Sequence, residues 1–94
     1  TFKALEDLSP QQIDMQIALN LTLPIHINQA AAGIFAQQGS GTIVNIGSTF
    51  GSIGFAQFSV YSAAKFGLRG FSEALRRELK DTGVKVVYIA LRAT

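Results

Sequence analysis

Apolar positions alternate with other residues from Ile13 to Ile27, which is the period of a β-strand. The stretch is about fifteen residues long, however, whereas a strand usually has about five or six, and Pro24 would interrupt a central ladder. The alanine-rich residues that follow favour a helix. We therefore predict a short helix near 10–19 and a longer one near 21–37, apolar on all sides and buried on more than one face.

The two predicted helices carry local signals at their ends. Ser9 is a typical N-cap, with Pro10 at the first helical position and Gln12 three residues after the cap. Pro24 has no N–H to donate to the carbonyl of Asn20, and its ring crowds the same carbonyl. We therefore expect a break in the helix before Pro24 and an Asn20 carbonyl that is free to bind a water molecule.

The second half of the chain has the pattern of a strand, a helix and a strand. The run 42–46 is β-branched and typical of a buried parallel strand, and 84–90 is predicted to be the next strand. A helix is predicted over 60–80, closed by Gly83 near the C′ position. Elements in this order form a right-handed βαβ crossover with parallel strands. The sequence therefore predicts an α/β fold.

Two faces of the predicted helix over 60–80 differ in side-chain size. The face expected to pack on the sheet carries Ala64, Leu68, Phe71, Leu75 and Leu79. Small residues alone occupy another face, namely Ala63, Gly67, Gly70 and Ala74. Glycine inside a helix costs up to about 1 kcal/mol relative to alanine, so its presence needs a reason. We expect a close approach of another helix there, either from a second subunit or from the same chain.

Composition narrows the class of protein. The 94 residues are 48% hydrophobic and 15% charged, which suits one small domain or less with apolar surface left to cover. A net charge of +2 is too small to indicate a nucleic-acid partner. The apolar runs are shorter than the roughly 18 to 20 residues that a membrane helix needs. The chain contains no cysteine, which is compatible with a reducing compartment. We expect a cytoplasmic protein with no membrane partner.

The candidate chemistry lies at Ser48, Tyr61 and Lys65. Residues four apart on a helix lie on one face, so the Lys65 ammonium can sit beside the Tyr61 hydroxyl. A neighbouring positive charge favours a phenolate and makes a phenol a better proton donor or acceptor near neutral pH. Ser48 follows a predicted strand and would supply a hydroxyl to a carbonyl oxygen where negative charge develops. His26, the only histidine, has no partner at metal-ligand spacing, so no metal site is expected.

With Asn20 upstream in Leu-Asn-Leu-Thr, these residues make the chain resemble the short-chain dehydrogenase/reductase family over nearly all of its length. The resemblance implies part of a Rossmann-type, doubly wound parallel sheet. It implies hydride transfer between NAD or NADP and a small-molecule alcohol or carbonyl substrate. Asn20, Ser48, Tyr61 and Lys65 would be the catalytic four, with Tyr61 and Lys65 also contacting the cofactor. Asn20 would hold a water that connects the lysine to solvent.

The chain also departs from the family pattern. Nothing in it matches the glycine-rich phosphate-binding turn with which members begin, and Leu91 and Arg92 stand where the family usually has proline and glycine. We therefore interpret residues 1–94 as a partial domain, the catalytic section of a longer subunit without its N-terminal cofactor half. The loop 49–59 contains aromatic residues that either line the substrate pocket or pack within the loop.

The resemblance also implies a homodimer or homotetramer assembled through the helices near 21–37 and 60–80. Because the cofactor half is missing, two interpretations of the polypeptide itself remain, and the first is an oxidoreductase of the short-chain type. The other interpretation is a non-catalytic fragment or oligomerisation module, because a dinucleotide site needs the element that receives its phosphates. Binding of NADH or NADPH to this polypeptide would separate the two.

Overall fold

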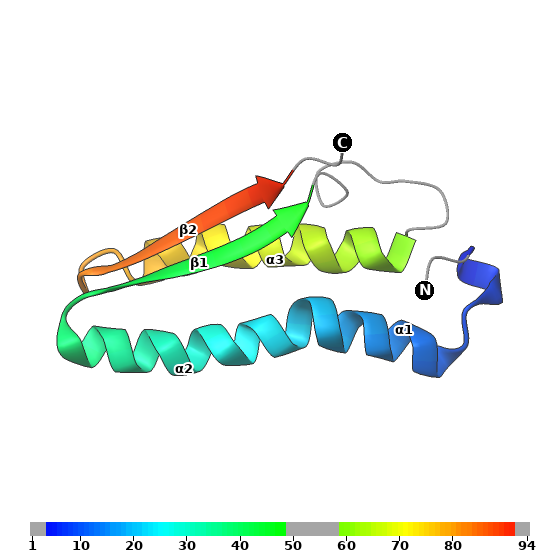
Figure 1. Cartoon of the computed structure of the whole chain (residues 1–94), viewed down its shortest axis with the longest axis horizontal. Coiled ribbons are helices and arrows are strands. Elements are labelled where there is room, and N and C mark those ends of the chain that lie inside the picture. Colours follow the sequence, from blue (N-terminus) through cyan, green and yellow to red (C-terminus); the bar gives the residue numbers. More distant parts are fainter. Residues whose placement is uncertain (1–3, 49–58, 92–94) are drawn as a thin grey trace.

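The computed structural model describes residues 4–48 and 59–91 (Figure 1). The order of elements in these two ranges is helices, strand, helix, strand, as the sequence pattern predicts. The bounds are η1 Leu5–Asp7, α1 Pro10–Ile17, η2 Ala18–Thr22, α2 Leu23–Gln38, β1 Gly41–Ser48, α3 Ser59–Glu78 and β2 Val84–Leu91. The α/β fold class is thereby confirmed.

Helix α1 begins where the capping signal predicts. The Ser9 hydroxyl accepts a hydrogen bond from the backbone N–H of Gln12 at 3.1 Å, and the Gln12 side chain accepts one from the backbone N–H of Ser9 at 2.9 Å. This reciprocal arrangement is a capping box, and Pro10 occupies the first helical turn. Two of the free N–H groups at the helix start therefore have partners.

The predicted break before Pro24 is wrong in its form, because the helix does not stop. A π-helical turn, η2, joins α1 to α2 without a gap, and the backbone N–H of Leu23 donates to the carbonyl of Ala18, five residues back. A π-turn admits one extra residue into the helix. The helix is therefore wider at this turn, and it continues past Pro24 although Pro24 has no N–H to donate. Asn20 lies within this widened turn.

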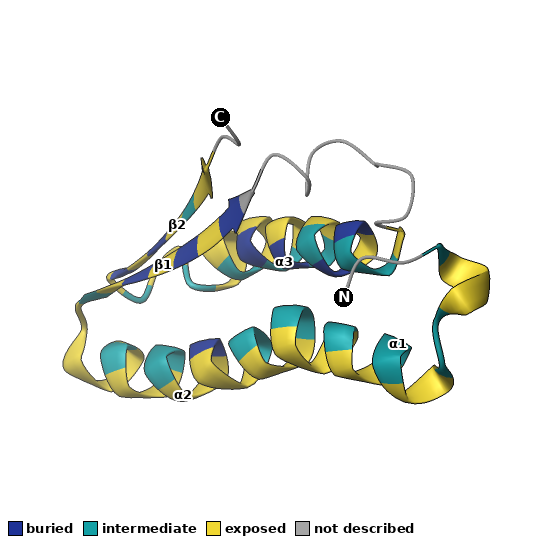
Figure 2. Ribbon diagram, turned by 45° about the vertical axis from the view of Figure 1, so that its right-hand side comes forward, coloured by how far each residue is buried: buried dark blue, intermediate teal, exposed yellow. Residues whose placement is uncertain are grey.

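The two strands form a parallel sheet in which Gly41 pairs with Val84 and Ser48 with Leu91. One face of the sheet is covered by α2 and α3 (Figures 1 and 2). The buried strand residues on this inner face include Ile43, Asn45, Val84 and Val86. The opposite face, here called the outer sheet face, is apolar and exposed in this chain, with Val44, Ile46, Val87, Ile89 and Leu91.

The prediction that the helix near 21–37 is buried on more than one face is wrong for this chain. Only Asn28 is buried in α2, and one side of the helix is exposed along its length (Figure 2). Apart from Ile17, the large exposed apolar side chains on α1, η2 and α2 form what we call the α1–α2 stripe, made of Met15, Leu19, Leu23, Ile27 and Ile34. Their spacing of four and seven residues keeps them on one side of the helix.

Helix α3 packs on the sheet through Ala64 and Leu68, which are 1% and 3% exposed. Its small-residue face has two different surroundings. A side chain on Gly67 would contact Leu21 of η2, with carbon atoms 3.1 Å apart, so the close helix here belongs to the same chain. A side chain on Gly70 would meet nothing within 4 Å among the described atoms. The expectation of a helix from the same chain is confirmed at Gly67, and that of a helix from a second subunit stays a prediction at Gly70.

A buried network of amides joins the helical layer to the sheet. Asn28 of α2 and Asn45 of β1 exchange two side-chain hydrogen bonds, each 2.9 Å long. The Asn45 amide also donates to the hydroxyl of Ser72 on α3 at 2.8 Å. Ser72 in turn donates to the carbonyl of Leu68, and Asn28 donates to the carbonyl of Pro24, both at 2.8 Å. One polar cluster therefore ties together three elements.

We predict that Asn45→Ala destabilises the complete protein by about 2 to 3 kcal/mol, since it leaves the amide of Asn28 and the hydroxyl of Ser72 buried with fewer partners. Urea unfolding of the complete protein with and without the substitution measures this loss. Asn28→Ala should cost a similar amount, and the double substitution less than the sum, because the two amides share their bonds. Strictly additive losses would contradict a shared network.

Candidate active site

The candidate residues lie at the end of the sheet where β1 and β2 finish and α3 begins (Figure 1). Tyr61 is on the first turn of α3, and Lys65 follows one turn later. The Lys65 Nζ lies over the Tyr61 ring, 5.7 Å from its centroid. This distance is within the usual range for a cation above an aromatic face. The Lys65 ammonium therefore lies over the Tyr61 ring, and its predicted place beside the hydroxyl stays a prediction.

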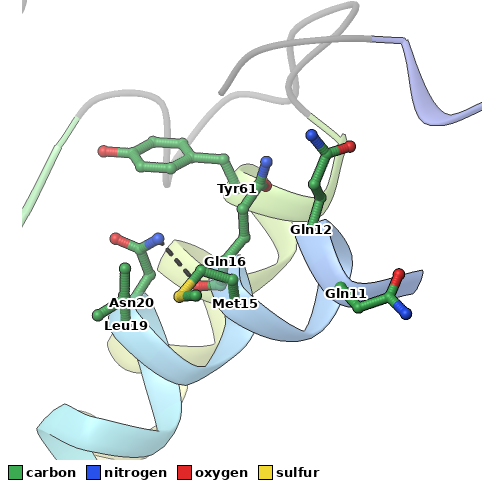
Figure 3. A pocket seen from close by; sticks show the side chains of 7 residues that line it. All are labelled: Gln11, Gln12, Met15, Gln16, Leu19, Asn20 and Tyr61. Carbon is green, nitrogen blue, oxygen red and sulfur yellow. Dashed lines mark hydrogen bonds between the residues drawn. The ribbon is translucent and has the colours of Figure 1, made fainter. Parts of the chain in front are cut away.

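Tyr61 also borders a cavity of about 460 Å³ between the start of α3 and the helices α1 and η2 (Figure 3). Its lining consists of Gln11, Gln12, Met15, Gln16, Leu19, Asn20 and Tyr61. The Asn20 amide lies on the same side as the Tyr61 ring and donates to the carbonyl of Gln16 at 2.9 Å. The structure therefore brings Asn20 and Tyr61 to a common space, one from the π-turn and one from α3.

Ser48 is the last residue of β1 and pairs in register with Leu91. It stands at the carboxyl end of the strand, where open α/β sheets bind their ligands, so its position in the fold agrees with the prediction. Its side chain belongs to the part of the chain that is not described, as do residues 49–58 and 92–94. The expectations for the aromatic loop and for Arg92 therefore lie outside the described residues.

Tyr88 and Ser62 lie near this end of the sheet, and sequence reasoning missed both. Their hydroxyl oxygens are buried and have no hydrogen-bond partner among the described residues. Burial raises the pKa of Tyr88 above its ordinary value of 10.0, a nearby Arg69 lowers it, and a nearby Tyr61 raises it. The two phenols are thus within electrostatic reach of each other. For Tyr88, the sequence offered one signal, namely a tyrosine with its polar hydroxyl within the apolar run of the last predicted strand.

Several other classes of site receive no support within residues 4–48 and 59–91. His26 is exposed on α2. This part of the chain contains no group of three or more His, Cys, Asp or Glu side chains placed to hold a metal ion. None of its helices has the length and hydropathy to cross a membrane.

The arrangement is suited to moving a proton. A phenol can donate or accept a proton as a general acid or base near a bound substrate. Tyr61 and Lys65 together offer a hydroxyl and N–H donors that could bind the hydroxyls of a sugar ring. The residues present fit the ribose end of a dinucleotide, whereas the phosphates need backbone N–H groups of a glycine-rich turn that this sequence lacks.

Comparison with known proteins agrees with this geometry. The family model described as short chain dehydrogenase matches residues 1–94. The chain is 41% identical over 81 residues to a D-beta-hydroxybutyrate dehydrogenase of Cupriavidus necator, covering 86% of this chain and 31% of that protein. It is 43% identical over 79 residues to nodulation protein G of Azospirillum brasilense, covering 84% of this chain and 32% of that one.

Among solved structures, the fold is similar to that of a bulky-bulky ketone specific alcohol dehydrogenase from Comamonas testosteroni. The TM-score is 0.92 with 35% sequence identity, over 100% of this chain and 39% of that one. A 4-hydroxyisoleucine dehydrogenase complexed with NADH has the same fold, with a TM-score of 0.91, 24% identity, and coverage of 96% of this chain and 40% of that one. The chain thus spans about a third of the length of the relatives it matches.

The raised pKa of Tyr88 predicts a loss of stability in alkali. Above about pH 10.0 the unfolded chain releases this proton while the folded protein retains it, so the unfolded state binds fewer protons and stability falls as pH rises. The groups facing this ring are Arg69, Glu73, Arg76 and Tyr61. Melting temperatures of the complete protein between pH 8 and about 11 should fall less steeply with Tyr88→Phe. Equal slopes in the two proteins would contradict the burial of this hydroxyl.

Proposed function

The chain belongs to the short-chain dehydrogenase/reductase family, and on that basis we propose that the complete protein is an oxidoreductase that transfers hydride between NAD or NADP and an alcohol or carbonyl substrate. The observation that carries the proposal is the stacking of the Lys65 ammonium over the Tyr61 ring, 5.7 Å from its centroid, at the carboxyl end of the parallel strands. This is where an α/β sheet binds its ligands.

Tyr61 would exchange the proton. In carbonyl reduction its hydroxyl donates a proton to the substrate oxygen, and in alcohol oxidation its phenolate accepts one. Lys65 keeps a positive charge near the ring, 5.7 Å from its centroid, because it lies one turn later on the same helix face. Without this proton donor, reduction of the carbonyl would leave an unprotonated alkoxide in the site.

Ser48 would steady the same substrate oxygen. Its place at the end of β1 puts it at the sheet edge that α3 approaches with Tyr61. A hydroxyl that donates to an oxygen where negative charge grows can lower the barrier by about 3 kcal/mol. Together with Tyr61 it would hold the carbonyl in one orientation.

Asn20 would maintain the supply of protons. The π-turn places Asn20 beside the cavity that Tyr61 borders. In an ordinary helix its carbonyl would accept a hydrogen bond from the N–H of residue 24, but Pro24 has no N–H. π-turns of this kind occur often at functional sites. We propose that the Asn20 carbonyl binds a water that links Lys65 to solvent, which lets the phenol regain its proton between turnovers.

Tyr61 and Lys65 are also the residues that would hold the ribose next to the nicotinamide. When bound, the nicotinamide supplies or accepts the hydride. The glycine-rich turn that would receive the phosphates is absent from this sequence, so we propose that the 94-residue chain does not turn over substrate alone. The names of two similar proteins, a hydroxybutyrate dehydrogenase and a ketone-specific alcohol dehydrogenase, support a small-molecule alcohol or ketone as the substrate class.

We also propose that the complete protein is a homodimer or homotetramer assembled through α2 and α3. The α1–α2 stripe supports this, because Leu23 and Ile27 are 48% and 59% exposed in the chain and would be covered by a partner. The open space beside Gly70 on α3 supports the close approach of a second helix there. Gly67 does not support it, since Leu21 of the same chain already fills that space.

Replacing Tyr61 by phenylalanine in the complete protein should reduce kcat by at least about a thousandfold, because the proton donor of the reaction is lost. Binding of NADH and NADPH, followed by fluorescence, should change by less than about threefold, since Lys65 remains. Ser59→Ala, at an exposed position two residues earlier on α3, is the matched control and should keep full turnover. Near-parental turnover with Tyr61→Phe would refute the role.

Replacing Ile27 by glutamate should shift the complete protein toward monomer in light scattering behind size-exclusion chromatography. A charge in an apolar interface loses its hydration without gaining a partner. Gln37→Glu adds the same charge at an exposed polar position of the same helix and should leave the assembly unchanged. A parent protein that is already monomeric would contradict the proposed assembly.

A further inference from the structure

The cavity beside Tyr61 has the size of a small-molecule site. Its volume is about 460 Å³, within the usual range of about 300 to 1,000 Å³ for ligand pockets, and the candidate proton donor forms part of its wall. A ketone whose oxygen reaches Tyr61 can therefore place the rest of its chain in this cavity. The side chains that complete the wall then decide which substrates fit.

The seven described residues that line the cavity include no Asp, Glu, His, Lys or Arg (Figure 3). Its apolar side chains are Met15 and Leu19, which begin the α1–α2 stripe, so this side of the cavity adjoins the proposed assembly surface. Apart from Tyr61, its polar side chains are all carboxamides, namely Gln11, Gln12, Gln16 and Asn20. A carboxamide donates and accepts hydrogen bonds but cannot neutralise an ion.

Two of these carboxamides have one end fixed by the fold, which sets the end that they offer to a ligand. The Gln12 Oε1 accepts the backbone N–H of Ser9 at 2.9 Å, so the N–H groups of its Nε2 are left to donate. In the view of Figure 3 this nitrogen is on the side nearer Tyr61. The Asn20 Nδ2 donates to the carbonyl of Gln16, so the Asn20 Oδ1 is left to accept. The cavity thus offers a neutral donor and a neutral acceptor beside the phenol.

The start of α1 does not make this cavity an anion site. A helix N-terminus binds anions through N–H groups that have no other partner. Here Pro10 has no N–H, and the N–H of Gln12 already donates to the Ser9 hydroxyl at 3.1 Å. The Lys65 ammonium lies over the Tyr61 ring, and the proposed function assigns it to the cofactor ribose. A carboxylate in this cavity would therefore lose its hydration without gaining a cation.

We propose that this cavity selects an uncharged ketone or alcohol that carries a hydrogen-bonding group, such as a carboxamide or a hydroxyl, on a short apolar chain. Gln12 donates to that group, Asn20 accepts from it, and Met15 and Leu19 contact the chain. The inference rests on the proposed function and deepens it. Of the substrate kinds in the names of two similar proteins, a hydroxy acid and a ketone, it favours the uncharged ketone.

The direct test compares each ketone amide with the acid of the same shape, using the complete protein. Acetoacetamide and acetoacetate are one such pair, and levulinamide and levulinate are a longer one. We expect kcat/KM with NADH or NADPH to be at least about thirtyfold higher for the amide of each pair, because the acid enters with an unpaired charge. Equal values, or a preference for the acids, would overturn the inference and leave the proposed function standing. A complete protein that reduces no ketone, charged or uncharged, would remove the proposed function and the inference with it.

Gln12→Glu tests the donor and keeps the helix cap. A glutamate here still accepts the Ser9 N–H, as in the usual capping box, but its ionised side chain has no N–H to donate. We expect the KM for acetoacetamide and levulinamide to rise by about fivefold or more, because the polar group loses its donor. The KM for methyl propyl ketone, which has no second polar group, should change less than about twofold, and the melting temperature should not fall.

Gln37→Glu is the matched control, because it makes the same substitution at an exposed position of α2 outside the cavity, and it should change none of these KM values. An unchanged KM for the two amides with Gln12→Glu would overturn the inference. So would an equal rise for methyl propyl ketone, since that ketone has no group for the Gln12 amide to bind. In both cases turnover of ketones by the parent protein leaves the proposed function standing.

Discussion

The paired amides of Asn28 and Asn45 are the interaction on which the arrangement of this chain depends. They exchange two hydrogen bonds of 2.9 Å across the boundary between α2 and β1, and Ser72 adds a third element, α3. An amide in a buried strand is tolerated only when its hydrogen bonds are satisfied, so a shift of any of the three elements would leave several buried groups unpaired. Apolar contacts could slide, whereas this network permits one registration.

That registration is also what the candidate chemistry needs. Asn20 lies one turn before Pro24, whose carbonyl accepts a hydrogen bond from Asn28. Ser48 lies three residues after Asn45 on the same strand. Lys65 lies about one turn before Leu68, whose carbonyl accepts a hydrogen bond from Ser72. Asn20, Ser48 and Lys65 thus each lie within four residues of a group in the network, and Tyr61 lies one turn before Lys65 on α3. We interpret the buried amides as the means by which a helix, a strand and a second helix present their reactive side chains at one end of the sheet.

Local patterns predicted the local structure. Ser9 and Gln12 predicted the start of α1, and β-branched runs predicted both strands. The spacing of four residues predicted that Lys65 lies close to Tyr61. The sequence could not predict the amide network, because its members are 17 and 27 residues apart and no periodicity connects them. Pro24 indicated a missing bond but not the π-turn that absorbs it. The exposure of the α1–α2 stripe was missed because an apolar pattern predicts that a helix is buried, but not whether the covering surface belongs to the same chain.

We infer that Ser48 and Tyr61 meet at one substrate oxygen in a framework fixed by the amide network. A crystal structure of the complete protein with NAD or NADP and a bound ketone or alcohol tests it most directly. We expect the Ser48 Oγ and the Tyr61 Oη both to lie about 3 Å from the same substrate oxygen, with the Asn28–Asn45 pair intact. A Ser48 hydroxyl directed away from that oxygen, or a substrate bound elsewhere than beside Tyr61, would contradict it.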